Sequence, residues 1–111
     1  MQDGRFTALG KVGAEVTIEE AKDAAKVTCL SGLAALKAEI GDLANVSRVV
    51  KLTVFVNSAP GFDQQPQVAN GASELLQEVF GDIGKHARSA VGMAELPFHM
   101  SVEIEFVFEV K

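Results

Sequence analysis

The chain has 111 residues, 48% of them hydrophobic, and its 15 acidic residues outnumber its 10 Lys and Arg to give a net charge of −5. This length predicts a single domain, residues 1–111, with one core. The basic residues are scattered and the chain has no Trp or Tyr. Both features argue against nucleic-acid binding, which phosphate neutralisation and base stacking drive.

The sequence shows no sign of a membrane or secretory destination. No apolar run reaches the ~18 residues that a membrane span needs, and the N-terminal residues lack the pattern of a signal peptide. We therefore expect a cytoplasmic protein with no membrane partner. The single cysteine, Cys29, rules out an internal disulfide and a multi-cysteine metal site, and we interpret it as a small buried apolar residue.

The first part of the chain predicts a weak strand followed by a long helix. Residues 4–16 are interrupted by glycines and have weak strand character. Thr17 and Glu20 have the spacing of a capping box, which marks a helix start. Apolar residues then recur at three-and-four spacing from Ile18 to about Ile40, and Gly41 stands where a helix ends.

The remainder predicts a strand, a second helix and two more strands. Residues 46–57 alternate as a strand does, with Leu52 and Val54 on one face and Val49 and Phe55 on the other. A helix is expected over 67–80, and strands over 88–96 and 101–110. The order β-α-β-α-β-β predicts an α+β sandwich, with two helices on one face of a mostly antiparallel sheet. The other face is half-polar, as subunit interfaces of small proteins often are.

Arg88 and Glu103 are the candidate functional residues. Arg88 shares one strand face with Ala90, Gly92 and Ala94, whose small side chains leave room for a ligand. A guanidinium matches a carboxylate through two parallel hydrogen bonds. Glu103, expected on the neighbouring strand, has the chemistry to orient or deprotonate a water molecule. The alternative is a rim salt bridge or two solvated side chains, worth roughly 0–1 kcal/mol.

The histidines and Ser89 provide weaker evidence for a functional site than Arg88 and Glu103. His86 and His99 lie far apart in the sequence with no second ligand at metal spacing, so a structural or surface role is favoured and no metal is expected. Ser89 has no histidine at a recognisable spacing for a hydrolase triad.

The C-terminal third closely resembles the signature of the Rid/YjgF family, which is RidA-like and is also labelled the endoribonuclease L-PSP family. The resemblance rests on "ARSAVGMAELP" (87–97), followed six residues after Pro97 by Glu103 within "SVEIE", and extends upstream to about Glu15. It implies a chorismate-mutase-like fold and a homotrimer with sites in clefts between subunits. It also implies hydrolysis of reactive 2-imino or 2-enamino acids to 2-keto acids and ammonia, without a cofactor.

The resemblance assigns roles residue by residue. Arg88 matches the arginine that binds the substrate carboxylate, Glu103 the glutamate that positions water, and Asn70 an asparagine of the pocket. Ala90 stands where the family often carries a pocket cysteine, so thiol chemistry is not expected there. The family's first strand, which reads roughly N-x-L-F-V-S-G-Q, has no counterpart here, so the resemblance implies an N-terminally truncated domain.

Three functions remain open at this point. The first is imine deamination by Arg88 and Glu103. The second is a non-catalytic, trimeric metabolite-binding or regulatory protein that uses Arg88 to hold a keto acid. The third is ribonuclease activity, a label attached to some relatives, which the acidic composition disfavours.

Overall fold

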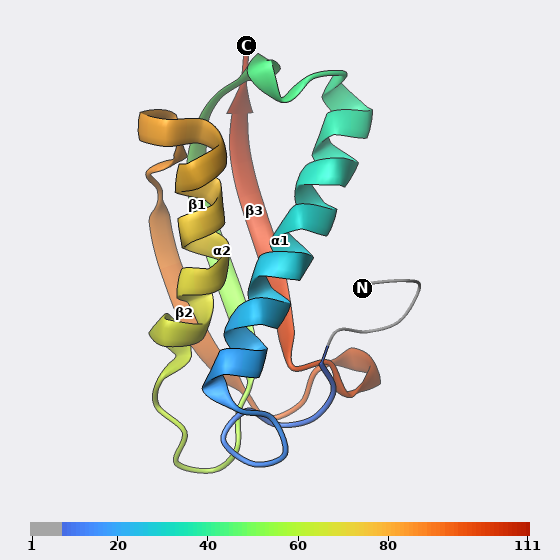
Figure 1. The fold of residues 1–111 in the computed structure, drawn as a ribbon, viewed down its shortest axis with the longest axis vertical. Helices are drawn as coiled ribbons and strands as arrows, with labels where there is room; N and C mark the ends of the chain where they lie inside the picture. The colour runs from blue at the N-terminus through green and yellow to red at the C-terminus, as the bar shows by residue number, and fades with distance from the viewer. Residues whose placement is uncertain (1–7) are drawn as a thin grey trace.

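A computed structural model describes residues 8–111 and contains two α-helices, three strands and short 3₁₀ turns (Figure 1). In chain order the main elements are α1 (Ile18–Ile40), β1 (Val46–Asn57), α2 (Gln65–Phe80), β2 (Ala87–Met93) and β3 (Val102–Val110). The 3₁₀ turns are η1 (Leu43–Asn45), η2 (Gly81–Gly84) and η3 (Pro97–His99).

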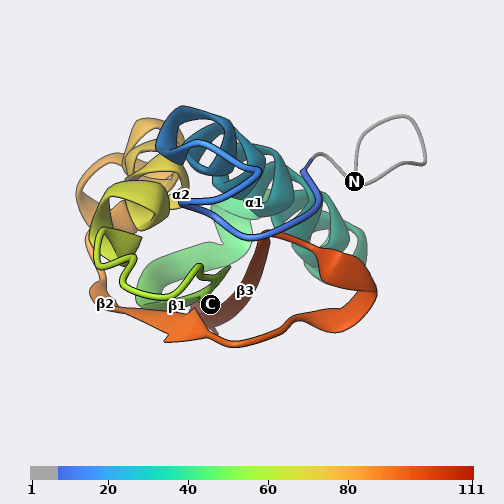
Figure 2. The ribbon, with the colours of Figure 1, turned by 90° about the horizontal axis from the view of Figure 1, so that it is seen from below.

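The three strands form one mixed sheet with the order β2-β1-β3. β1 pairs in parallel with β2, through the crossover helix α2, and antiparallel with β3. Both helices cover the same face of this sheet, and the opposite face carries no helix (Figure 2). The predicted α+β sandwich, with two helices on one face of the sheet, is therefore confirmed. The sheet is mixed rather than mostly antiparallel, because the crossover through α2 makes β1 and β2 parallel.

Helix α1 begins and ends where the sequence predicts. The Thr17 hydroxyl accepts a hydrogen bond from the backbone N–H of Glu20, and the Glu20 carboxylate accepts one from the N–H of Thr17. Two of the N–H groups that a helix start leaves without partners are satisfied in this way. At the other end Gly41 adopts a φ of 89°, which ends the helix at Ile40.

The core lies between the helices and the covered face of the sheet. Leu52, Val54 and Val56 of β1 are completely buried there. α1 contributes mainly small side chains, among them the buried Cys29, which confirms the prediction for that residue. The two helices approach so closely that a Cβ added at Gly71 of α2 would collide with the carbonyl oxygen of Lys22 in α1. Small residues at this contact allow the close packing.

Two sequence predictions about strands were wrong. Residues 8–16 form isolated bridges rather than a strand, because Gly10 and Gly13 have φ angles of 112° and 93° that break an extended chain. Val49, placed on the half-polar face, is 1% exposed and belongs to the core. An irregularity in the pairing of β1 with β3 between Val49 and Lys51 shifts the alternation at that point.

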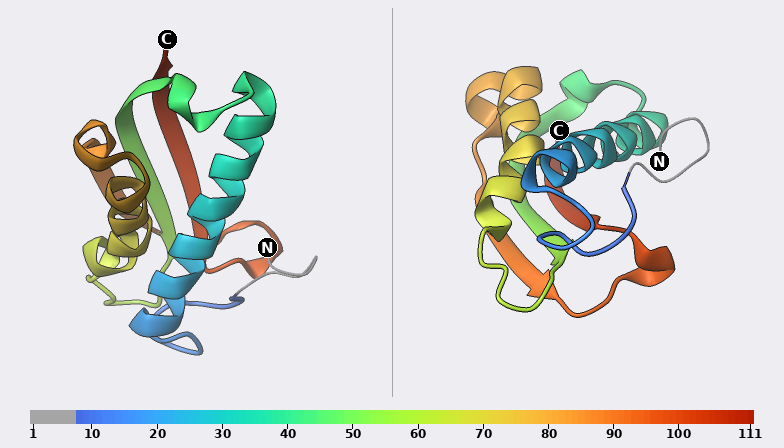
Figure 3. Two further views of the ribbon diagram at one scale, coloured as in Figure 1. Left: turned by 45° about the horizontal axis from the view of Figure 1, so that its top comes forward. Right: turned by 60° about the horizontal axis from the view of Figure 1, so that its bottom comes forward.

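β2 and β3 are not neighbours, so the prediction that Glu103 lies on the strand next to Arg88 was wrong. β2 ends at Met93 rather than Leu96, and the connection that follows crosses the end of β1 before β3 begins (Figure 3). β1 therefore lies between them. Among the described residues no helix is long and apolar enough to cross a membrane.

Candidate functional site

Arg88 lies on the helix-covered side of the edge strand β2. It pairs in register with Leu52, just as Ala90 pairs with Val54 and Gly92 with Val56. Because paired residues point to the same face of a sheet, all three β2 residues face the helix layer, beside α2. Arg88 is exposed and Ala90 is half-buried, and the predicted stripe of small residues beside the arginine is confirmed for Ala90 and Gly92.

The guanidinium of Arg88 is held by two side chains of α2. Its Nη1 donates to Oδ1 of Asn70 at 2.7 Å and to Oγ of Ser73 at 3.2 Å. Asn70 and Ser73 are three residues apart, which places them on one face of the helix. The structure thus brings together two of the predicted site residues, Arg88 and Asn70, and adds Ser73, which was not among the residues predicted from the sequence.

His86 extends this cluster. Its Nδ1 lies 2.6 Å from the carbonyl oxygen of Gly84, and its Nε2 lies 3.0 Å from Oγ of Ser73. A carbonyl only accepts hydrogen bonds, so Nδ1 carries a proton. In the neutral ring Nε2 is therefore an acceptor, and the Ser73 hydroxyl donates to it. We call Asn70, Ser73, His86 and Arg88 the Arg88 network.

The hydrogen bonds of this network leave a defined part of the guanidinium open. Nη1 has two hydrogens, and Asn70 and Ser73 accept one each. Within the described residues, the hydrogens of Nε and Nη2 have no acceptor and Arg88 has no ion pair. The N–H groups of Nε and Nη2 lie along the same edge of the planar guanidinium, and this edge can bind both oxygens of one carboxylate.

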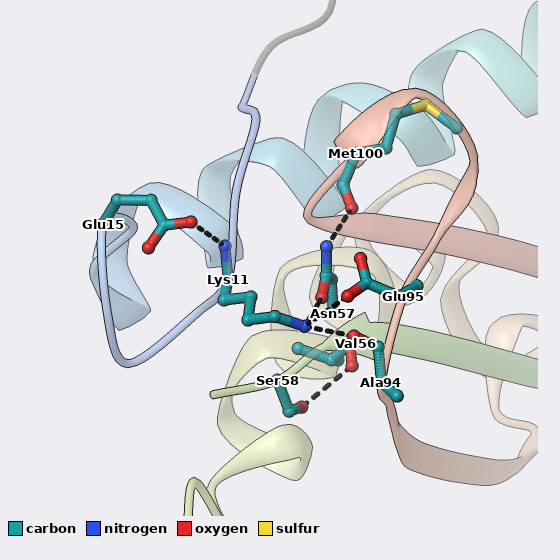
Figure 4. Close-up of polar contacts among 8 residues, drawn as sticks. All are labelled: Lys11, Glu15, Val56, Asn57, Ser58, Ala94, Glu95 and Met100. Atoms are coloured by element: carbon teal, nitrogen blue, oxygen red, sulfur yellow. Dashed lines mark hydrogen bonds and ion pairs between the residues drawn. The ribbon is translucent and has the colours of Figure 1, made fainter. Parts of the chain in front are cut away.

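Lys11 provides a contrast, because its ammonium group is bound within the chain by two hydrogen bonds and an ion pair (Figure 4). Nζ donates to Oδ1 of Asn57 at 3.1 Å and to the carbonyl of Ala94, and it pairs with the Glu95 carboxylate at 3.5 Å. Asn57, 1% exposed, also donates to the carbonyl of Met100. Lys11 therefore ties the segment before α1 to the ends of β1 and β2.

Glu103 does not meet Arg88 within one chain. It pairs with Phe55, whose side chain points to the open face, whereas Arg88 pairs with Leu52 on the covered face. Two strand spacings of about 4.8 Å and three residues of about 3.3 Å separate their Cα atoms by about 14 Å. Glu103 is exposed and forms no ion pair within the described residues.

Two surface hollows of about 380 and 290 Å³ lie elsewhere. The larger is lined by residues of η1, the end of α2 and the chain end, and the smaller by charged residues of α1 and α2. Neither is lined by Arg88, Asn70, Ala90 or Glu103. No group of three or more His, Cys, Asp or Glu side chains within residues 8–111 is arranged to hold a metal ion.

Comparison with known proteins identifies the family to which the chain is similar. The sequence model of a family described as "YjgF/chorismate mutase-like, putative endoribonuclease" matches residues 1–109. The chain is 50% identical over 101 residues to "Protein TCP17" of Trypanosoma cruzi. That alignment covers 90% of this chain but only 63% of the length of its relative.

Two crystal structures are similar over nearly the whole chain. A protein of unknown function from Agrobacterium tumefaciens, Atu1372, superposes with a TM-score of 0.97 at 46% identity, covering 99% of this chain and 71% of that one. A "putative endoribonuclease" from Shewanella oneidensis superposes with a TM-score of 0.96 at 26% identity, covering 99% of this chain and 73% of that one.

Proposed function

Because the chain belongs to the YjgF/chorismate mutase-like family, we propose that it hydrolyses reactive 2-imino acids, and their 2-enamino tautomers, to 2-keto acids and ammonia. The observation that carries this proposal is the open Nε/Nη2 edge of Arg88, which Asn70 and Ser73 fix from the opposite side. Such an edge suits the one feature that substrate and product share, a carboxylate next to the reacting carbon.

The reaction asks little more of the protein than orientation and a placed water molecule. A protonated imine carbon is already electrophilic, so the water oxygen adds to C2 and gives a carbinolamine. One proton of the added water passes to the nitrogen, and the C–N bond then breaks as the C=O bond forms. The remaining hydroxyl proton leaves with the departing ammonia as ammonium, so protonated imine and water give keto acid and ammonium. Glu103, an exposed carboxylate, would accept the hydrogen bond of the attacking water.

A site that uses both Arg88 and Glu103 needs more than one copy of the chain, since one chain holds them on opposite sheet faces about 14 Å apart. We therefore place it in clefts between subunits of a homotrimer. The open face, with Phe55 half-buried and Val91 and Val107 39% and 47% exposed, provides apolar surface for such contacts. Light scattering should give a mass three times the 11.7 kDa of the chain.

The second candidate function is a non-catalytic trimer that binds a metabolite carboxylate. It is favoured by the same separation, because Arg88 with Asn70 and Ser73 forms a carboxylate site without Glu103. RNA is not proposed as a ligand, because the net charge of −5 opposes the phosphate contacts that drive RNA binding.

The test is to generate 2-iminopropanoate with an amino-acid oxidase and follow its disappearance with and without the protein. We expect acceleration that Arg88→Ala abolishes and Glu103→Gln strongly reduces, while Glu103→Gln still binds pyruvate. Arg48→Ala and Glu105→Gln are matched controls, since Arg48 is an exposed arginine of β1 and Glu105 shares the open face of β3 with Glu103. Pyruvate binding without acceleration would favour the second function, and equal loss in the controls would contradict both.

A further inference from the structure

We infer that Ser73 and His86 are positioning residues of the Arg88 site, which hold the guanidinium in the orientation that receives a carboxylate. This inference rests on the proposed function, because it concerns the same site. It assigns a role to His86, for which the sequence pattern favoured only a structural or surface role.

The directions of the hydrogen bonds form one continuous chain. Arg88 Nη1 donates to Ser73 Oγ, Ser73 donates to His86 Nε2, and His86 Nδ1 donates to the carbonyl of Gly84. The 2.6 Å bond to a backbone carbonyl fixes the ring, and in the neutral ring the nitrogen that faces Ser73 is then the one without a proton. His86 thereby determines where the serine hydrogen points.

The direction of that hydrogen matters because Ser73 lies inside α2. A serine within a helix can instead donate to the carbonyl four residues earlier, which here belongs to Ala69. His86 competes with this alternative and keeps the Ser73 oxygen turned toward Arg88. Without the imidazole, the Ser73 hydroxyl is no longer held toward Arg88. The hydrogen bond from Arg88 Nη1 to Ser73 is then lost, and only Asn70 holds the guanidinium.

The pair acts through Arg88 and not as a nucleophile with its base. Ser73 is 7% exposed, and its oxygen already accepts from Arg88 and donates to His86. A substrate carbon therefore has no path to it. The contribution of the pair is preorganisation: an arginine held in its binding orientation loses less side-chain freedom when the ligand arrives.

The expected loss of affinity follows from the side-chain entropy that an unrestrained Arg88 would lose on binding. Immobilising one long side chain on binding corresponds to about a two- to tenfold change in affinity. We expect Ser73→Ala and His86→Ala each to weaken pyruvate binding, and to raise KM for 2-iminopropanoate, by about this factor, with kcat nearly unchanged. The double variant should be no worse than Ser73→Ala alone, because both residues act through one chain of contacts.

The conservative variant separates positioning from simple packing. His86→Gln keeps a side-chain carbonyl able to accept from Ser73, so its affinity should return toward the native value, whereas His86→Ala should not recover. Thermal unfolding of each variant checks that the fold is intact. Unchanged affinity in both alanine variants, or additive losses in the double variant, would overturn the inference.

A readout that needs no ligand distinguishes the failure of this inference from failure of the proposed function. NMR relaxation of the Arg88 Nε–H group should report a rigid side chain in the native protein and a mobile one in Ser73→Ala and His86→Ala. A mobile Arg88 in the native protein would overturn the positioning role. Rigid Arg88 without pyruvate binding would instead overturn the proposed function and leave no carboxylate for the pair to position.

Discussion

Replacing Gly71 by alanine tests the close contact between α1 and α2. In an unhindered helix this change stabilises by about 1 kcal/mol, because alanine is the better helix former. Here the added Cβ would collide with the carbonyl oxygen of Lys22, a backbone atom that moves only if a turn of α1 moves with it. Overpacking of this kind costs typically about 1–3 kcal/mol.

Because the colliding atom belongs to the backbone, we expect a cost in the upper part of that range, about 2–3 kcal/mol. Subtracting the gain of about 1 kcal/mol leaves a net loss of about 1–2 kcal/mol in the free energy of unfolding. A loss of that size lowers Tm by roughly 5–10 °C for a domain of this length. Urea unfolding should show a lower midpoint with an unchanged slope, since the exposed surface is the same. Pyruvate binding should weaken as well, because Gly71 lies between Asn70 and Ser73, and a displaced α2 moves both away from Arg88.

Gly32→Ala is the matched control, since Gly32 also lies inside a helix. Its added Cβ would approach Cε2 of Phe106 at 2.6 Å, but this is the edge of a half-buried ring that can turn aside. We expect Gly32→Ala to change stability far less than Gly71→Ala. If Gly71→Ala is as stable as the native protein, the helices yield freely and the argument from close packing is refuted.

Three further predictions concern the core and α1. Leu52→Ala should cost about 2–5 kcal/mol in urea unfolding, because Leu52 is fully buried in the central strand, and a loss below 1 kcal/mol would contradict that burial. Burial raises the pKa of the Cys29 thiol to about 12, so thiol reagents at pH 8 should label it only on unfolding; rapid labelling of the folded protein would disprove the burial. Hydrogen bonds from the backbone N–H of Thr17, and then from its hydroxyl, lower the pKa of Glu20. The ionised Glu20 carboxylate therefore stabilises the fold fully above about pH 4.5, and this stabilisation is lost as the pH falls through the lowered pKa. Glu20→Gln should flatten the acid-unfolding profile in that range, and an unchanged profile would show that protonation of Glu20 does not affect stability.

The local elements could be predicted from the sequence because their signals are local. α1 is bounded by the Thr17–Glu20 capping box and Gly41, and β1 by its own alternation, so their limits agree with the structure. Val49 was misplaced because the irregularity in β1 depends on its pairing with β3, which the residues of β1 alone do not reveal.

The arrangement of the site could be predicted only in part. The motif identified Arg88, Glu103 and Asn70, and the contact of Arg88 with Asn70 is present. The sequence could not reveal that β1 lies between β2 and β3, because a short connection does not imply that strands are adjacent. His86 and Ser73 were missed because their spacing matches no catalytic motif, although Ser73 follows Asn70 by three residues on the same helix face.

The Arg88 network has a further consequence for how such a protein can evolve. Its four side chains all come from the segment between Asn70 and Arg88, two from α2, one from the short link between η2 and β2, and one from β2. Recombination or insertion elsewhere in the chain leaves this segment whole, whereas a length change in η2 would shift its two halves apart. Glu103 lies outside it, on another strand and another face. Under the proposed function, selection could therefore retain the recognition of carboxylates while the hydrolytic step is gained, altered or lost independently.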